Sequence, residues 1–520
     1  MISSSSIIKK TLEISGSTLL SRFLGIIREI LTVSYLGAGA VSDAFLTAYK
    51  IPNSLRKIFA EGALSAAFIP TLVKVVREKK MSEANSLMSI AFLFFESIVL
   101  ILCVLVLWKT EQIIQLIAPG FSSEQVTQAV PFLRVLMPFI FFLSSSALLA
   151  GALQSVGHFF VPAFSPVLLN IVFITGLLIC TFFSLPVLYL CFFILFGGFL
   201  QLIVHILTYW QLQFSFGPIN RTSVQAFGSI FAKFFLCSIS MSIIEISLFI
   251  DTSFASYLPN GSISLIYYAN RFVGIPLGIF AVAFSTILLP HFARIGAYAP
   301  KRLNFYLLES TKLIFWVTIP MMCMLCFFAE KIFHTLFLSN KFTIDQVVQA
   351  SHILIAFSLG LFFFSINKIL LNIYYAIHVT WVPAAISAFA TLINVGLNML
   401  FIDRFAAPGL AFATTIAGTT QTILFLWVLC SYYKFQFYTA RFFLFAKSYL
   451  TQLLCILTLF YILFILFERF ISSLPISLSS FFLYKIGFWL WTGPLCLACM
   501  LAFYYTRHYF NINLYFLGKQ

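Results

Sequence analysis

Residues 87–108 read LMSIAFLFFESIVLILCVLVLW. An apolar run of this length is long enough to cross the hydrocarbon core of a bilayer as a helix. The rest of the chain has the same character, since its 520 residues are 61% hydrophobic and only 9% charged, with a mean hydropathy of +1.03. Soluble domains carry about 25% charged residues. The composition therefore predicts an all-α integral membrane protein.

Apolar runs of membrane length recur along the whole sequence and predict about fourteen transmembrane helices. The predicted spans are 14–36, 40–72, 87–108, 131–156, 160–181, 186–210, 226–255, 263–291, 311–330, 348–373, 380–402, 407–432, 446–468 and 482–506. The second span is too long for one straight helix, and we expect Pro52 to kink or start it.

The net charge of +15 is distributed unevenly over the predicted loops. One set of loops and tails carries most of the basic residues: Lys9, Lys10, Lys74, Arg77, Lys79, Lys80, Arg221, Arg294, Lys301, Arg302, Lys434, Arg441, Arg507 and Lys519. The other set carries only Lys109, Lys331, Lys341, Arg404 and Arg469. The positive-inside rule therefore predicts that both termini are cytoplasmic. Charges within the first span argue against a cleavable signal, so we expect this span to act as an anchor.

Two short sequence matches at nearly one offset indicate an internal repeat. ALSAAFIP at 63–70 corresponds to AFSTILLP at 283–290, and HFFVPA at 158–163 corresponds to HVTWVPA at 378–384. An offset of about 220 residues covers six helices and so preserves orientation, which predicts two parallel lobes with substrate bound between them. The predicted organisation is an N-terminal lobe over 1–220, a C-terminal lobe over 221–440 and two extra helices over 441–520.

Charged residues inside the predicted spans point to an anion-binding site. An arginine at the centre of a spanning helix costs about 2.5 to 3.5 kcal/mol, so Arg28, Arg56 and Arg271 are expected to face a wet cavity. The first two spans also hold Arg22, Lys50 and Lys57 against Glu29, Asp43 and Glu61. Arginine suits a pyrophosphate because its planar fork donates to two oxygens at once. Internal ion pairs with snorkelling ends are the alternative interpretation.

Several functional classes lack their sequence signatures. The cysteine pairs Cys323/Cys326 and Cys496/Cys499 have no nearby histidine or carboxylate in register for a metal, and the sequence contains no phosphate-binding G-x-x-x-x-G-K-[ST] loop. The longest loops, near 109–130 and 211–225, are too short for the extramembrane domain of a membrane transferase. We therefore expect a transporter driven by a gradient or by its substrate, not an enzyme, and no nucleic-acid partner.

Three segments resemble the MurJ (MviN) family of bacterial lipid II flippases. They are SRFLGIIRE at 21–29 with GAG at 37–39 and DAF at 43–45, then KIPNSLRKIFAEGA at 50–63, and YYANRF at 267–272 with GIFAVAFSTILLP at 278–290. The resemblance covers nearly the whole chain at the level of fourteen spans.

The resemblance implies a transporter of the multidrug/oligosaccharidyl-lipid/polysaccharide superfamily with a cationic central cavity and a lipid-tail groove formed by the last two helices. Such a protein moves lipid II, an undecaprenyl-pyrophosphate-linked disaccharide-pentapeptide, from the cytoplasmic to the outer leaflet of the inner membrane by alternating access, and we expect it to act as a monomer. The family's substrate-binding positions carry over to Arg28, Arg56, Arg271, Arg22, Lys50, Asp43, Glu61 and Glu29. Asn270 stands where the family often has an acidic residue before the arginine.

Some members of the family also hold a sodium ion. The ligand positions carry over to Asp251, Asn394, Asn398 and Thr414, and two amides spaced i, i+4 suit a hard cation. The family can carry Asp at the position of Asn398, so a hydrogen-bonded network of buried amides is the alternative.

Other classes of function remain open on the sequence alone. A drug or cation antiporter of the same superfamily would present carboxylates where cations dominate here, and another member could instead move a polysaccharide-linked lipid. A lipid-linked glycosyltransferase or polymerase would need acidic residues in larger outer loops, and a channel would need no lipid groove.

Overall fold

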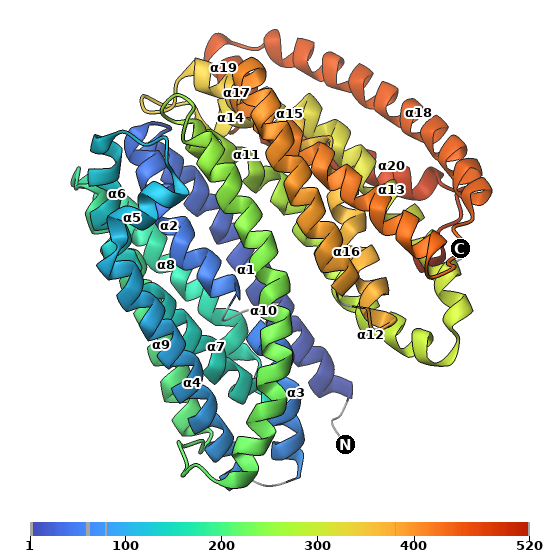
Figure 1. Ribbon diagram of the computed structural model, residues 1–520. Coiled ribbons are helices and arrows are strands. Elements are labelled where there is room, and N and C mark those ends of the chain that lie inside the picture. The colour runs from blue at the N-terminus through green and yellow to red at the C-terminus, as the bar shows by residue number, and fades with distance from the viewer. Residues whose placement is uncertain (1–3, 59–62, 79–80, 380, 518–520) are drawn as a thin grey trace. The chain divides into compact units, whose positions relative to one another are not determined.

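The computed structural model describes residues 4–58, 63–78, 81–379 and 381–517, and these residues are almost entirely helical, with a single isolated bridge between Ser339 and Phe342 (Figure 1). The chain divides into two compact units, Met1–Ser264 and Leu265–Gln520. The predicted all-α membrane fold is confirmed. The lobe boundaries predicted from the sequence are not tested by this division and stay a prediction.

Unit 1 contains ten helices among its described residues. They are α1 (Ser4–Leu36), α2 (Ala40–Arg56), α3 (Ala63–Arg77), α4 (Met81–Trp108), α5 (Thr110–Ile117), α6 (Ser123–Leu136), α7 (Phe139–Ser155), α8 (Phe160–Phe182), α9 (Val187–Gln211) and α10 (Arg221–Ala255). Helix α8 packs between α1 and α9, and α10 packs against α3 and α4 (Figure 1).

Unit 2 begins within α11, and its helices are often interrupted. They are α11 (Ser262–Pro276), η2 (Leu277–Val282), α12 (Ala283–Tyr298), η3 (Pro300–Arg302), α13 (Leu303–Phe327), α14 (Ala329–Phe337), α15 (Ile344–Ser358), α16 (Leu361–Ala376), α17 (Trp381–Ser431), α18 (Thr439–Ser472), α19 (Ile476–Tyr484), α20 (Phe488–Thr506) and η4 (Tyr515–Leu517). The segment η2 is a π-helix that joins α11 to α12.

Nine helical segments of the described chain are long and apolar enough to cross a membrane, or ten if the pair α15 and α16, bent by 41°, forms one span. The predicted count of fourteen therefore stays a prediction. Two of its boundaries can be checked. The long helix α17 contains a non-helical residue, Ala406, between the spans predicted to end at 402 and begin at 407. Helix α2 begins at Ala40 and runs through Pro52 to Arg56, so Pro52 does not start a helix, and a kink at Pro52 stays a prediction.

The two units repeat the same helix ends at a fixed offset. A capping box joins Ser122 and Gln125 before α6, and an equivalent box joins Thr343 and Gln346 before α15, 221 residues later. In each box the cap hydroxyl accepts from the backbone N–H of the glutamine, and the glutamine side-chain oxygen accepts from the backbone N–H of the cap residue. Identical capping at matched positions supports the internal repeat that the sequence predicted, and the parallel orientation of the two lobes stays a prediction.

Left-handed residues after helices recur in the same way. Gly157 corresponds to His378, and Gln213 corresponds to Lys434, again 221 residues apart, and all four have positive φ. After α7 and α16 the next residue bonds back five positions, from His158 to the Leu153 carbonyl and from Val379 to the Tyr374 carbonyl. This helix-terminating turn satisfies carbonyls at the end of each helix that would otherwise lack an intrahelical partner.

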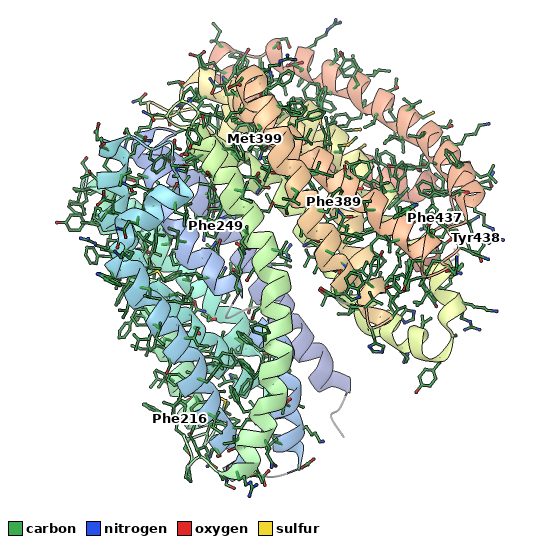
Figure 2. The ribbon with its side chains drawn as sticks, viewed as in Figure 1. Phe216, Phe249, Phe389, Met399, Phe437 and Tyr438 are labelled. Carbon is green, nitrogen blue, oxygen red and sulfur yellow. The ribbon has the colours of Figure 1, made fainter. Side chains whose placement is uncertain are left out.

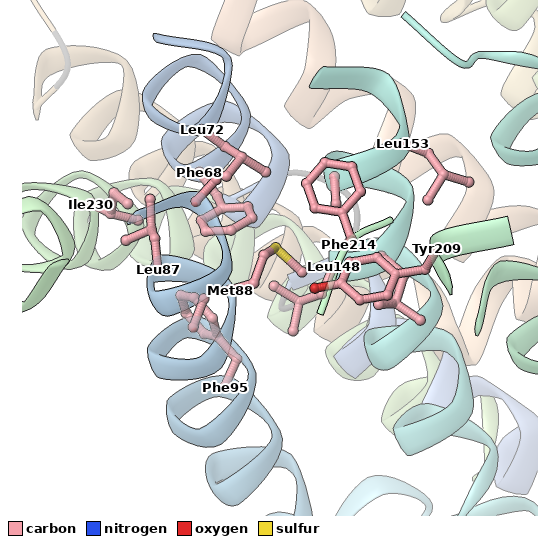
Figure 3. Close-up of a cluster of buried hydrophobic side chains, with 14 of the residues drawn as sticks. Phe68, Leu72, Leu87, Met88, Phe95, Leu148, Leu153, Tyr209, Phe214 and Ile230 are labelled. Carbon is pink, nitrogen blue, oxygen red and sulfur yellow. The ribbon is translucent and has the colours of Figure 1, made fainter. Parts of the chain in front are cut away.

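The core of unit 1 forms where α3, α4, α7, α9 and α10 meet. Phe68, Met88, Leu148 and Tyr209 are at most 1% exposed, and Figure 3 shows them gathered between these helices. Burial of aromatic and aliphatic side chains from several helices fixes the relative positions of α3 and α7. Those two helices line the polar cavity described below.

The outward faces of many helices are apolar. Phe389 and Met399 of α17 are each at least half exposed, and so is Phe216 in the loop between α9 and α10; all three are labelled in Figure 2. A soluble protein would not expose so many large apolar groups, whereas lipid tails solvate them.

The last helices of unit 2 are joined by an aromatic cluster. Phe328, Phe460, Phe464 and Phe488 lie with their ring centroids 5.7 to 6.3 Å apart, which fastens α18 and α20 to the end of α13. Part of the high phenylalanine content therefore serves packing. The lipid-tail groove expected here stays a prediction.

Candidate functional site

Arg28 is held in the middle of unit 1 by residues of its own helix and of α8. Its Nη1 donates to Asn170 Oδ1 at 2.9 Å, its Nη2 donates to Glu29 Oε1 at 2.7 Å, and its guanidinium lies 5.1 Å from the ring centroid of Phe173. Asn170 also donates to the Ser21 carbonyl on α1. These contacts fix the plane of the guanidinium, as recognition of a two-oxygen anion requires.

Arg56 is the last residue of α2, and its Nε and Nη2 both donate to Asn53 Oδ1 one turn earlier, at 3.2 and 3.0 Å. It lines a cavity of about 210 Å³. The walls come from α3, α7, α8 and α9, and include Ser165 and Pro166.

Helix α8 relates the two unit 1 arginines to each other. Pro166 lines the cavity with Arg56, and Asn170, one helical turn further, binds Arg28. The structure thus places two of the three predicted arginines along one helix. Whether they bind one pyrophosphate stays a prediction.

Asp43 binds backbone groups at the start of α11. Its Oδ2 accepts from Gly261 N–H at 2.6 Å, and its Oδ1 accepts from the N–H and hydroxyl of Ser264 at 2.8 and 2.6 Å. Gly261 has φ +98°, and a Cβ there would come within 2.7 Å of the Ala38 carbonyl, so only glycine fits. The buried Asp43 carboxylate therefore has a structural role as a helix-end cap.

Lys50 of α2 and Lys57, the residue that follows α2, both bind groups on α10. Lys50 donates to the Leu248 carbonyl and to Thr252 Oγ1, and Lys57 pairs with Glu245 at 3.0 Å. Lys50 and the C-cap residue Lys57 are seven positions apart, and so are their α10 partners Thr252 and Glu245, so two polar contacts one heptad apart join the C-terminal part of α2 to α10. The contacts of Lys50 and Lys57 therefore support the alternative interpretation, in which charges within the spans bind other groups of the protein. Their role in substrate binding stays a prediction.

Arg271 lies in unit 2 on α11 and is exposed. Its Nη2 donates to the Tyr267 hydroxyl one turn earlier, and its guanidinium lies 4.6 Å from that ring's centroid. Stacking on tyrosine orients the guanidinium without neutralising it.

The remaining residues predicted to bind substrate are Arg22, Glu29 and Glu61. Arg22 lies exposed on α1, and Glu29 is paired with Arg28. Glu61 lies outside the described residues.

Three of the four sodium candidates contact one another in unit 2. The Asn398 amide donates to Asn394 Oδ1 at 2.8 Å, and the Asn394 amide donates to Thr414 Oγ1 at 3.2 Å. Asp251 belongs to unit 1. The described residues contain no cluster of three or more His, Cys, Asp or Glu side chains suited to a metal.

Sequence reasoning missed the partners of the charges. Asn170, Glu245 and Thr252 were not singled out, although a polar residue within an apolar span is the signal that could have found them. Gln201 and His205, on consecutive turns of α9, were missed as neighbours of Arg56 for the same reason.

Comparison with known proteins places these features in a family. The sequence profile described as "Lipid II flippase MurJ" matches residues 32–483. The probable lipid II flippase MurJ of Buchnera aphidicola subsp. Acyrthosiphon pisum is 32% identical over 428 residues, covering 80% of this chain and 83% of the relative. That of Haemophilus influenzae is 33% identical over 424 residues, covering 78% and 83%. The chain belongs to the MurJ family.

Solved structures agree with membership of the MurJ family. A lipid II flippase MurJ in an inward closed conformation matches with a TM-score of 0.76 and 27% identity, covering 96% of this chain and 98% of that one. An inward-facing multidrug resistance MATE family transporter matches with a TM-score of 0.68 at 14% identity. That second likeness shows a shared fold only.

Proposed function

We propose that this protein is a flippase that moves lipid II from the cytoplasmic to the outer leaflet of the bacterial inner membrane by alternating access, for peptidoglycan synthesis. The observation that carries the proposal is the MurJ family match over residues 32–483. The fixed guanidinium groups of Arg28 and Arg56 support it, because oriented forks favour a pyrophosphate over a cation. The protein performs no covalent chemistry in this proposal and acts as a monomer.

The other candidate is a superfamily exporter of drugs or cations, favoured only by the shared MATE fold. The sign of the ligand's charge separates the two. Purified protein is expected to retain fluorescent lipid II and not cationic dyes, since arginines attract the pyrophosphate and repel a cation. Binding is measured by fluorescence anisotropy in detergent, with excess unlabelled lipid II as the competition control. Retention of the dyes without lipid II would make the exporter the better candidate.

We also propose that both termini lie in the cytoplasm, because the basic residues gather in the loops and tails on the side of the termini. A cysteine at position 260 is then expected to react with an impermeant reagent from outside intact cells. Reaction only after permeabilisation would show that position 260 faces the cytoplasm and that the predicted topology is inverted.

We also propose that sodium binds Asp251, Asn394, Asn398 and Thr414. The four side chains offer carboxylate, amide and hydroxyl oxygens, which fit a hard cation, although Asn394 Oδ1 now accepts from Asn398. Asp251→Asn is expected to abolish a sodium-specific rise in melting temperature, and Asn398→Asp to enlarge it by adding a second negative charge. Thermal unfolding in sodium and in potassium measures this. A wild type that responds equally to both ions would leave only a hydrogen-bonded contact between helix segments.

A further inference from the structure

Glu96 is an acidic residue buried near the middle of α4, one of the helices long and apolar enough to cross a membrane. It is only 4% exposed. The Ser144 hydroxyl on α7 donates to Glu96 Oε1 at 2.8 Å, and among the described residues no group forms a hydrogen bond with Glu96 Oε2. A carboxyl group within a membrane span indicates a functional role, and proton binding is one such role.

The helices that pack against α4 are α3, α5, α7 and α10. Helix α7 contains no titratable residue. The titratable residues of the other three helices are Lys74, Arg77, Glu111, Arg221, Lys233, Cys237, Glu245 and Asp251. Those with described side chains form no hydrogen bond or ion pair with Glu96, and Glu245 is instead paired with Lys57.

Lys233 is the cation on α10 that the tests below must address. Its side chain lies outside the described part of the structure. The next residue, Phe234, packs on Phe95 with 4.6 Å between the ring centroids. Position 233 therefore lies at about the level of Glu96, and the proton site is tested with and without this lysine.

The described contacts of Glu96 fit a neutral carboxyl group. A buried carboxylate needs a cation or several donors, because one hydroxyl group does not offset the loss of its hydration. A protonated carboxyl needs no cation and has an O–H group to donate. Ser145, the next residue along α7, also lies beside the carboxyl, and its buried hydroxyl oxygen forms no hydrogen bond with the described residues. This oxygen can accept from a protonated Glu96.

Helix α7 separates Glu96 from the cavity that Arg56 lines. Ser144 binds Glu96, and Ser146, two residues later, lines the cavity with Arg56. A helix with its side chains is about 10 Å across, and two charges at that distance interact appreciably inside a protein because the dielectric constant is low. An anion bound at Arg56 therefore disfavours a negative charge on Glu96 and favours its protonated form.

We propose that Glu96 is a proton-binding site of unit 1, and that its carboxylate takes up a proton from solvent when an anionic substrate enters the cavity beside Arg56. This inference rests on the proposed lipid II transport and names the proton as the ion that accompanies the substrate. Coupling is reciprocal, so protonation of Glu96 strengthens binding of a pyrophosphate by the factor by which the pyrophosphate strengthens binding of the proton. Loss of the proton at alkaline pH weakens substrate binding.

Infrared spectroscopy of the purified full-length protein, in a detergent without carbonyl groups, tests the proton site alone. Near neutral pH, wild type is expected to show the C=O stretching band of a protonated carboxyl, and Glu96→Gln is expected to lack it. The matched control Glu245→Gln should keep the band, because the buried Glu245 carboxylate is held ionised by Lys57. A spectrum without the band in wild type, or with the band only in Lys233→Gln, would show an ionised Glu96 and overturn the proposal.

Binding of a polyprenyl pyrophosphate tests the coupling. Wild type and Glu96→Gln are expected to bind it equally at mildly acidic pH, because glutamine resembles the protonated carboxyl. At alkaline pH wild type is expected to bind about fivefold more weakly than Glu96→Gln, the lower end of usual coupling factors. The ratio of the two affinities removes the titration of the phosphate and of His205 in the cavity. Competition against a fluorescent lipid pyrophosphate measures both affinities.

Glu124→Gln, which changes an exposed acid of unit 1, should follow wild type at every pH. Thermal unfolding monitors the fold of each variant. An affinity ratio between Glu96→Gln and wild type that stays constant with pH would overturn the coupling and leave lipid II transport standing. Failure of wild type to bind the lipid pyrophosphate at any pH would instead count against the proposed function, and the infrared band would still decide whether Glu96 binds a proton.

Discussion

Replacing Arg28, Arg56 or Arg271 by alanine is expected to abolish complementation of a conditional flippase-depleted strain while protein levels stay near normal. Hydrogen bonds to charged groups are worth about 1.5 to 3 kcal/mol each, so loss of one fork lowers affinity for a pyrophosphate at least tenfold. Arg→Lys is expected to fail at one or more of these sites, because an ammonium cannot donate two parallel bonds. Growth after depletion and membrane immunoblots measure the two quantities.

Arg134→Ala in unit 1 and Arg404→Ala in unit 2 are the matched controls, since both side chains are exposed. Both variants should grow like wild type. Normal growth of all three site variants would remove the arginines from the substrate site, and loss of protein in the immunoblot would assign them a folding role.

Asp43→Ala is expected to destabilise the protein by about 3 kcal/mol or more. The substitution removes a buried carboxylate that accepts three hydrogen bonds and leaves the N–H groups of Gly261 and Ser264 without their acceptor. Asp43→Asn keeps one acceptor oxygen and should lose less. Thermal unfolding of the full-length protein in detergent gives the ranking.

The exposed Asp403 provides the control, and Asp403→Ala should unfold at the wild-type temperature. The same experiment separates two roles for Asp43. A variant Asp43→Ala that melts normally but no longer binds lipid II would place the carboxylate in substrate recognition and not in the framework.

The internal repeat was predicted from weak matches, and the structure supplied stronger ones. The segments SSEQVTQA at 122–129 and TIDQVVQA at 343–350 hold the two equivalent capping boxes. They could have been found in the sequence, because a hydroxyl residue followed three positions later by glutamine is a local signature. The helix-ending residues His378 and Lys434 could not, because nothing in their side chains requires a positive φ.

The arginines of the candidate site were predicted from the sequence, but most of their hydrogen-bond partners were not. Arg28 and Arg56 stood out because a charge in an apolar span is expensive wherever the helix lies. Their hydrogen-bond partners Asn170 and Asn53 differ in their distance along the sequence. Asn53 is three residues from Arg56 and was within reach of local reasoning, whereas Asn170 is 142 residues from Arg28 and becomes a neighbour only when α1 packs on α8.

The sequence by itself determined the membrane character, the helical fold class and the family, because hydropathy, charge and motifs are properties of short segments that need no partner. Only the tertiary structure decided which charged side chains have partners within the protein. In it Asp43 accepts hydrogen bonds at the start of α11, and Lys57 forms an ion pair with Glu245. It alone also brought Gln201 and His205 to the cavity that Arg56 lines. Hydrogen bonds act over about 3 Å, and packing brings groups more than a hundred residues apart to that distance.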